Sequence, residues 1–243
     1  MGLRRYLDLL RAPGVAPLVA ASTLGRLPYG MNVLALILLL RSEGFDYAEV
    51  GIVTGASGLA VGLTAPLLGR VVDRLGQTRV LVATGLLYLS ADTGLAVAVL
   101  SGAEVVPLTA LAALGGAATP PISPSMRTLW PELVGRERLD TAFAFDALQL
   151  EIFFILGPLL AAGLATLISP EFAFLAGVTM VGAGALAFAA APASRRWRPA
   201  PAADGPRAGA LSVPGLRTLC RCSPLCSWWP GWLSRPPRQP ATR

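Results

Sequence analysis

The chain has 243 residues, of which 54% are hydrophobic and only 14% are charged, and its mean hydropathy is +0.61. A soluble domain carries about a quarter charged residues, so this composition excludes an ordinary soluble protein. The formal net charge of +6 comes from arginine alone, because the sequence contains no lysine and no histidine. These arginines lie in short segments between apolar runs, which indicates orientation in a lipid bilayer and argues against a nucleic-acid partner.

Six apolar runs are long enough to cross a bilayer, which takes about 20 residues in a helix. They occupy residues 14–40, 48–68, 80–101, 105–126, 143–168 and 171–192. The first run follows several charged residues and is too long for the core of a cleavable signal peptide. The sequence therefore predicts an all-α membrane protein with a six-helix transmembrane domain over residues 1–194.

The arginines alternate between the two sides of this arrangement. One set of joints holds Arg4, Arg5, Arg11, Arg70, Arg74, Arg79, Arg127, Arg136, Arg138, Arg195, Arg196 and Arg198. The opposite joints hold only Arg41, together with Glu43, Asp46, Glu49, Glu104 and Glu171. Positive residues stay on the cytoplasmic side of a membrane. We therefore expect a multi-pass protein of the cell (inner) membrane with both termini in the cytoplasm.

The two halves of the six-span unit repeat a pattern of prolines. Pro28 in the first run and Pro120 in the fourth are 92 positions apart, as are Pro66 in the second and Pro158 in the fifth. The first and fourth runs cross the membrane in opposite directions, so the pattern predicts a 3+3 inverted repeat. Inverted repeats with matching helix interruptions are typical of transporters, whose substrate site lies near the membrane midplane.

A charged segment, "GRVVDRLGQTR" at residues 69–79, separates the second and third runs. Gly69 leaves room where two helix ends approach, and Gly76 can adopt the left-handed conformation that ends a helix. Asp73 provides a carboxylate suited to a helix N-terminus or an arginine.

This segment resembles the cytoplasmic signature between helices two and three of the major facilitator superfamily, roughly Gly-x3-Asp-Arg-x-Gly-x-Arg-Arg. The matching positions are Gly69, Asp73, Arg74 and Gly76. Thr78 stands where a basic residue is usual, and Arg79 supplies the charge one position later. In the family the carboxylate at the Asp73 position helps to latch the two halves of the transporter in the outward-facing state. The resemblance thus implies a conformational-switch motif, with Arg79 included.

The resemblance also implies the function and the partners. It covers residues 1–219 as the N-terminal six-helix half of a transporter that moves a small molecule by alternating access, so a C-terminal half is missing. The segment "EIFFILGPLLAAG" partly resembles the Gly-Pro signature of antiporters and favours export, although Phe153, Ala161 and Ala162 replace its usual glycines. A proton is a candidate coupling partner, but the basic residue often found early in helix four is absent.

Charged residues inside the runs are candidates for substrate or proton handling, because a charge at that depth is costly unless it is paired or hydrated. Arg26 lies about 18 Å into the first run at 1.5 Å per residue. Glu151 lies at a similar depth in the fifth run. We expect an Arg26–Glu151 pair that faces a central cavity, with Asp146 as a competitor nearer the surface. The alternative is a static pair that only holds the two spans together.

Prolines predict where helices are interrupted near this cavity. Pro28 interrupts the first run, and Pro120, Pro121 and Pro124 interrupt the fourth, because each removes a backbone donor. We also predict an interruption at Gly157 and Pro158 in the fifth run. Non-helical backbone at membrane depth requires protein or a wet cavity around it. Tyr29, Asn32 and Ser123 are the predicted polar lining, whereas Asp92 in the third run is expected to have a structural partner.

No enzyme site, cofactor or metal site is predicted. The body of the chain lacks histidine, cysteine, a phosphate-binding loop and a nucleophile motif. The three cysteines, Cys220, Cys222 and Cys226, lack a fourth ligand for a metal ion.

The end of the chain differs in composition from the rest. We expect residues 195–219 to be a cytoplasmic linker and residues 220–243 to be an aberrant, disordered tail. This tail holds all three cysteines and three of the five tryptophans, and an alternate reading frame of GC-rich DNA permits an apolar run there. The sequence therefore predicts a frameshifted, truncated transporter. The alternative function is a non-transporting membrane fragment or association module.

Overall fold

The structure is a computed structural model that describes residues 6, 9–12 and 14–197. In this part of the chain six helical stretches are long and apolar enough to cross a membrane. Their helices are α2 (Val15–Arg26), α3 (Pro28–Ser42), α4 (Tyr47–Leu75), α5 (Gln77–Leu100), α6 (Val105–Ala117), α7 (Ile122–Val134), α8 (Leu139–Leu167) and α9 (Pro170–Ala190). A 3-10 turn, Arg136–Arg138, precedes α8, and the short helix α10 (Pro192–Arg196) follows α9. The protein is a multi-pass membrane protein.

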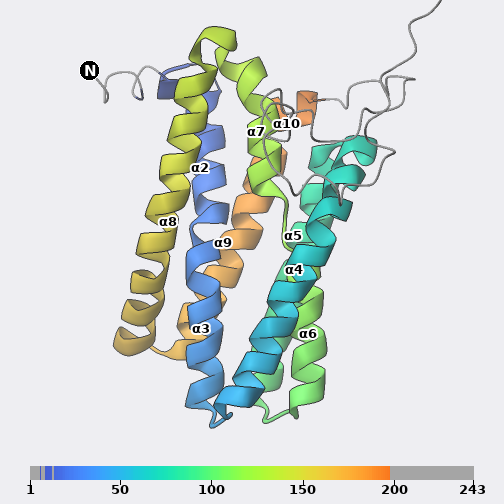
Figure 1. The fold of residues 1–243 in the computed structure, drawn as a ribbon, viewed down its shortest axis with the longest axis vertical. Coiled ribbons are helices and arrows are strands. Elements are labelled where there is room, and N and C mark those ends of the chain that lie inside the picture. Colours follow the sequence, from blue (N-terminus) through green and yellow to red (C-terminus); the bar gives the residue numbers. More distant parts are fainter. Residues whose placement is uncertain (1–5, 7–8, 13, 198–243) are drawn as a thin grey trace, which may run out of the picture. The chain divides into compact units, whose positions relative to one another are not determined.

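The first and fourth spans each consist of two helices, as predicted. Span one changes direction between α2 and α3, where Pro28 has no N–H for the preceding turn. Span four is interrupted between α6 and α7, at Ala118–Pro121, where two consecutive prolines remove two donors. Figure 1 shows both interruptions, the second as a stretch of coil between α6 and α7. Because Pro28 and Pro120 occupy matching positions, the interruptions recur in the two halves of the repeat.

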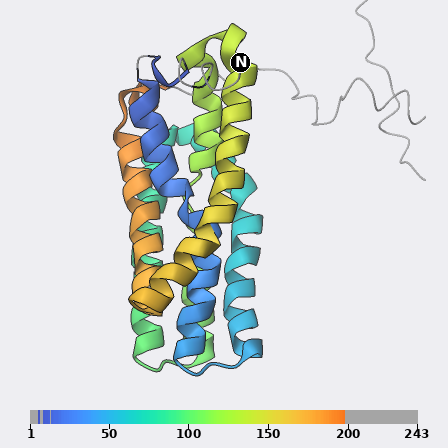
Figure 2. The same cartoon turned by 90° about the vertical axis from the view of Figure 1, so that its left-hand side faces the viewer.

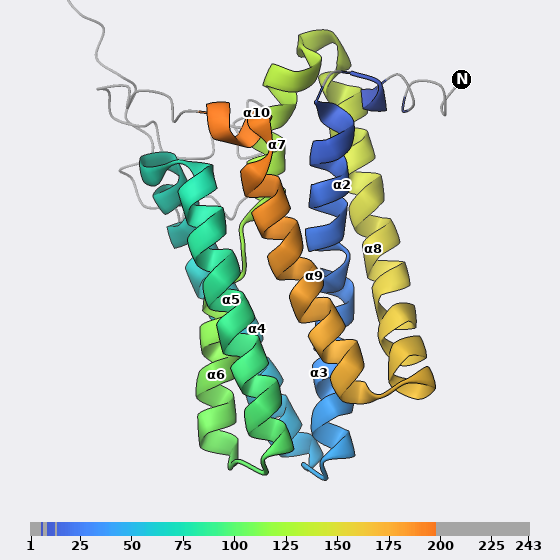
Figure 3. The same ribbon diagram turned by 180° about the vertical axis from the view of Figure 1, so that it is seen from behind.

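Helix packing follows the same symmetry and confirms the 3+3 inverted repeat. The first span packs on the fifth through α3 and α8, and the fourth packs on the second through α6 and α4. The first span also packs on the sixth (α9), as the fourth does on the third (α5). The third and sixth spans, α5 and α9, pack on each other, which is visible from behind in Figure 3. Exchanging spans one, two and three for four, five and six reproduces each of these contacts.

Glycines allow the closest of these helix contacts. A Cβ on Gly184 of α9 would overlap the backbone of Gly25 of α2. A Cβ on Gly157 of α8 would lie 2.6 Å from the carbonyl carbon of Gly30 of α3. Small residues let transmembrane backbones approach in this way, and van der Waals packing then holds the helices together. Figure 2 shows α8 crossing in front of the first span, with α3 behind it.

The second and fifth spans are the least covered. Within an apolar stretch of 18 residues, only 11% is buried in the span Tyr47–Leu75 and 17% in Arg136–Leu167, against 39–56% in the other four spans. Both carry large exposed apolar side chains, among them Leu59, Leu63, Phe154 and Leu159. These two spans correspond to each other in the repeat, so the six-helix unit leaves two related faces open.

Some predicted boundaries and interruptions are wrong. The predicted joint over residues 127–142 is largely helical, since α7 continues to Val134 and α8 begins at Leu139. No interruption occurs at Gly157–Pro158, because α8 continues through both residues. Pro124 does not break a helix either. It lies in the first turn of α7, where backbone N–H groups have no helical acceptor and a proline loses nothing.

The segment 69–79 contains almost no loop. α4 ends at Leu75, Gly76 has a φ of 84°, and α5 begins at the next residue. Gly76 therefore adopts the positive φ expected of it. At Gly69, by contrast, a Cβ would meet nothing within 4 Å, so the predicted close approach is not found among the described residues.

Thr78, the position where the signature is broken, has a local role in the structure. Its hydroxyl donates to the Ser194 carbonyl at 3.1 Å, and the buried Gln77 amide donates to the same carbonyl at 3.4 Å. These contacts tie the start of α5 to α10. The structure thus uses this position to join two helices of the fold.

Most of the predicted linker and the whole predicted tail, residues 220–243 with the three cysteines, lie outside the described residues. Of the linker, only residues 195–197 are described, and α10 crosses its predicted start at residue 195.

Candidate functional site

A buried ion pair joins the first and fifth spans. Arg26 is the last residue of α2, and its guanidinium donates from Nη1 to Asp146 Oδ1 of α8 at 2.6 Å. The side-chain exposed fractions are 0% for Arg26 and 1% for Asp146. The same Nη1 also lies 3.3 Å from the Ser22 hydroxyl one turn earlier. Burial of two charges is tolerated only when they are paired in good geometry.

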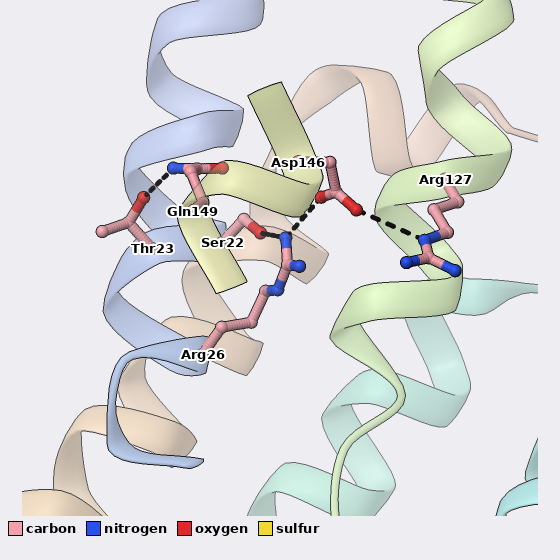
Figure 4. A network of polar contacts seen from close by, with 6 residues as sticks. All are labelled: Ser22, Thr23, Arg26, Arg127, Asp146 and Gln149. Carbon is pink, nitrogen blue, oxygen red and sulfur yellow. Dashed lines mark hydrogen bonds and ion pairs between the residues drawn. The ribbon is translucent and has the colours of Figure 1, made fainter. Parts of the chain in front are cut away.

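The fourth span joins this pair through Arg127 of α7. Arg127 Nε lies 3.3 Å from Asp146 Oδ2, and 57% of the arginine side chain is exposed. One carboxylate thus contacts two arginines on two different spans, and Figure 4 shows both approaching it from opposite sides. A neighbouring bond from Gln149 Nε2 to the Thr23 hydroxyl, 2.9 Å long, also joins the first and fifth spans. The network ties spans one, four and five together.

The predicted Arg26–Glu151 pair is not formed. Asp146, Gln149 and Phe153 lie on the buried face of α8, whereas Glu151 is exposed. Five residues along a helix turn a side chain by about 140°, so Glu151 points away from the face that carries Asp146. The depth of Glu151 in the membrane suggested the pair, but its direction on the helix excludes it. Arg26 pairs instead with the predicted competitor.

The ion pair leaves hydrogen-bonding capacity unused. Arg26 Nε and Nη2 are buried and have no hydrogen-bond partner within the described part of the chain, and the same holds for the hydroxyl of Ser125 on α7. Buried polar groups without partners are uncommon and costly in folded proteins. These atoms could therefore form hydrogen bonds to a water molecule or to a further polar group.

A cavity lies beside the interruption of span four. Its volume is about 130 Å³. Spans one, two and four supply its lining residues, which are Tyr29, Val61, Thr64, Ala65, Leu68, Gly116, Thr119, Pro120, Pro121, Ser123 and Pro124. None of these side chains is charged. The lining combines apolar surface with a few hydroxyl groups, as small-molecule sites do, but the cavity is smaller than the roughly 300–1,000 Å³ of pockets that enclose a drug-sized ligand.

Two of the three predicted lining residues border this cavity. The Tyr29 hydroxyl donates to the Pro120 carbonyl at 2.8 Å, which satisfies an acceptor in the interruption of span four. Ser123, in the first turn of α7, also lines the cavity. Asn32 does not line it. Its amide Nδ2 donates to the Tyr88 hydroxyl of α5 at 2.6 Å.

Asp92 of α5 belongs to the same polar group as Tyr88 and Asn32. It lies one turn after Tyr88, is 7% exposed, and interacts with the Tyr88 hydroxyl. The sequence indicated a structural partner for Asp92 but did not identify Tyr88. A signal was available, because residues i and i+4 of a helix lie on one face.

No group of three or more potential metal ligands occurs in the part of the chain that the structure describes.

Comparisons with known proteins agree with this architecture. Residues 18–234 match the sequence pattern of the Major Facilitator Superfamily. The chain is also 31% identical, over 169 residues, to a protein of Sinorhizobium fredii (strain NBRC 101917 / NGR234) described as the uncharacterized MFS-type transporter y4rN. This match covers 69% of the chain but only 42% of the relative. No solved structure matches the chain.

Proposed function

The chain belongs to the major facilitator superfamily, and we propose that it is the N-terminal half of a transporter that exports a small molecule by alternating access. Membrane transport in general follows from the family and from the relative's description.

The observation that carries the proposal is the cavity at the interruption of span four. Three spans converge there, and the site lies where the inverted repeat places its matching helix interruptions. Binding sites of such transporters lie near the midplane at discontinuous helices. We propose that Tyr29 and Ser123 contact the substrate there, and that Arg26, Asp146 and Arg127 form a neighbouring network that rearranges between states. We propose no direct contact with the substrate for Glu151 or Asn32.

A second six-helix half is the proposed partner. The chain spans 42% of the relative's length, and two related faces, on α4 and α8, are open. On α4 a Cβ at Gly51, Gly55, Gly58 or Gly62 would meet nothing within 4 Å. Glycines at this spacing favour close packing of another transmembrane helix. The open faces therefore fit a protein partner better than lipid alone.

We further propose that the segment 69–79 acts as the switch between states. Asp73, Arg74 and Arg79 are exposed at the joint of α4 and α5, where a second half can reach them. Export is favoured by the partial antiporter signature around Gly157, which here packs on Gly30. The proposed location is the cell (inner) membrane with both termini cytoplasmic.

The test is ligand binding to the purified chain. A ligand that binds only the folded state raises the unfolding midpoint, because it stabilises that state by RT ln(1 + L/Kd), where L is the free ligand concentration. A panel of neutral and cationic lipophilic compounds should contain some that raise the thermal midpoint of the wild type. Tyr29→Phe and Ser123→Ala should reduce that shift. Thr166→Ala is the control, because its hydroxyl is exposed on α8 and bonds only to its own helix.

Two outcomes would contradict the site. Either no compound shifts the midpoint, or the two cavity variants respond as the wild type does. For a compound that binds, accumulation in everted membrane vesicles would support export, and accumulation only in right-side-out vesicles would refute it.

A second candidate function is a non-transporting membrane fragment that associates with other subunits. The open faces of α4 and α8 favour it equally. The discriminating observation is transport. A chain that binds no compound but co-purifies with a second membrane subunit would be an association module.

A further inference from the structure

Asp92 is a buried carboxyl group that the proposed transport site does not use. It lies in the interior of α5, eight residues before the helix ends at Leu100, which is about 12 Å along the axis. Among the described residues no cation forms an ion pair with it. An ionised, unpaired carboxylate at such a depth is costly, so a protonated form competes with the charged one.

The surroundings of Asp92 are shaped to hold its polar head. A Cβ on Gly115 of α6 would overlap the Asp92 carboxyl, and a Cβ on Gly177 of α9 would overlap the Asn32 amide. Each polar group therefore occupies a space that exists only because the facing residue is glycine. The two glycines thus leave room for the Asp92 carboxyl and the Asn32 amide inside the helix packing.

Among the residues that the structure describes, no charged side chain faces Asp92. The other titratable side chains on elements packed against α5 lie toward helix ends, and they are Tyr47, Glu49, Arg70, Asp73 and Arg74 on α4, Glu104 before α6, Glu171 on α9, and Arg195 and Arg196 on α10. The groups that face Asp92 are Tyr88, Asn32 beyond it, and more distantly Tyr29.

We propose that Asp92, Tyr88 and Asn32 form a proton-binding site in which protonation of Asp92 reverses the direction of a hydrogen-bond chain to the first span. When Asp92 is a carboxylate, the Tyr88 hydroxyl donates to it and accepts from Asn32 Nδ2. Asn32 Oδ1 then has no hydrogen-bond partner among the described residues, which is the arrangement in the structure. When Asp92 takes up a proton, its O–H donates to Tyr88, the Tyr88 hydroxyl turns to Asn32, and the Asn32 amide flips to present Oδ1.

The step takes up one proton from solvent, and this proton binds to one oxygen of the Asp92 carboxylate. No other group is ionised, because Tyr88 and Asn32 only rotate. Each state keeps two hydrogen bonds: the charged state leaves Asn32 Oδ1 unpaired, whereas the protonated state pairs Oδ1 and releases Asn32 Nδ2, so the step is favoured by removal of the buried charge. Asn32 lies one turn after Tyr29 on α3, and Tyr29 borders the cavity and bonds to Pro120. Coupling of this proton to transport rests on the proposed function, whereas proton binding itself does not.

Infrared difference spectroscopy of the purified chain across a pH titration tests the site without any substrate. A protonated carboxyl has a C=O band that a carboxylate lacks. We expect a titrating carboxyl band in the wild type that is lost in Asp92→Asn, a substitution of equal size that fits the same space. Asp140→Asn, at an exposed carboxyl in the first turn of α8, is the control and should retain the band.

Reversal of the hydrogen bonds among Asp92, Tyr88 and Asn32 should give a separate infrared signal. A tyrosine C–O band should change together with the carboxyl band, and Tyr88→Phe should remove the tyrosine change while the carboxyl still titrates. A carboxyl band that survives in Asp92→Asn, or a tyrosine signal independent of pH, would overturn the proposal. If the cavity variants fail the ligand test while this band titrates, the proposed function fails and the proton site stands.

Discussion

Arg26 and Asp146, 120 residues apart in the chain, form an ion pair 2.6 Å long from which solvent is excluded. The pair sits where α2 ends and α3 begins, so a charged contact holds the interruption of the first span against the fifth. Its value for stability depends on keeping both partners, because removing one leaves a buried charge uncompensated.

Asp146→Ala should therefore be strongly destabilising. We expect a loss of about 3–5 kcal/mol in the free energy of unfolding, the range measured when one partner of a buried pair is removed. The double variant Arg26→Met with Asp146→Leu should recover most of this loss, because no charge remains buried. Unfolding by SDS in mixed micelles measures both.

Arg127→Gln is the matched control for this prediction. Arg127 contacts the same carboxylate but is 57% exposed, and exposed ion pairs contribute at most about 1 kcal/mol. A loss as large as that of Asp146→Ala would show that the exposed partner, and not Arg26, balances the carboxylate.

The partner of Arg26 illustrates what sequence patterns predict and what they miss. Composition, hydrophobic length and arginine placement predict six spans, and proline spacing predicts the repeat, because these depend on local sequence. The Arg26–Glu151 prediction is wrong because the depth of a residue in the membrane does not determine the direction in which its side chain points from the helix. Asp146 and Glu151 differ in depth by little more than one turn, but α8 presents them to different surroundings.

Gly157→Ala should destabilise the contact between α8 and α3. The added Cβ would lie 2.6 Å from the Gly30 carbonyl carbon, so the two backbones must separate. Overpacking of this kind typically costs about 1–3 kcal/mol. The free energy of unfolding in mixed micelles is again the measurement.

Gly163→Ala, on the same helix, provides the comparison. A Cβ at Gly163 would meet nothing within 4 Å, so the change should be neutral or stabilising by about 0.5–1 kcal/mol through helix propensity. Equal losses for the two variants would mean that backbone approach at Gly30 does not limit position 157.

Gly76→Ala should weaken the joint between α4 and α5. Gly76 has a φ of 84° and a ψ of 149°, a region used almost only by glycine that costs other residues roughly 1–3 kcal/mol. Gly69→Ala tests the same segment without this strain, since Gly69 is helical and faces open space. We expect a lower thermal midpoint for Gly76→Ala and an unchanged or higher one for Gly69→Ala. The opposite order would show that the segment needs room at Gly69 instead.

The joints were harder to predict than the spans for a physical reason. Polar composition marks where a helix leaves the hydrocarbon region, but it does not end the helix. Thus α7 continues through Arg127 and Glu132, and α8 starts at Leu139 directly after a 3-10 turn. In the same way Pro158 removes one donor from α8 without breaking it, because the rest of the helix remains bonded.

The orientation prediction can be tested with two single-cysteine variants, after Cys220, Cys222 and Cys226 are replaced by serine. Glu104→Cys is preferable to Asp46→Cys on the arginine-poor side. The Asp46 carboxylate accepts from Glu49 N at 2.8 Å and caps α4, whereas Glu104 makes no side-chain cap bond at the start of α6. Arg136→Cys reports the arginine-rich side, and both native residues are exposed. Because positive residues remain cytoplasmic, a membrane-impermeant maleimide should label position 104 in intact cells and position 136 only after permeabilisation. The reverse pattern would place both termini outside and would also invert the proposed direction of transport.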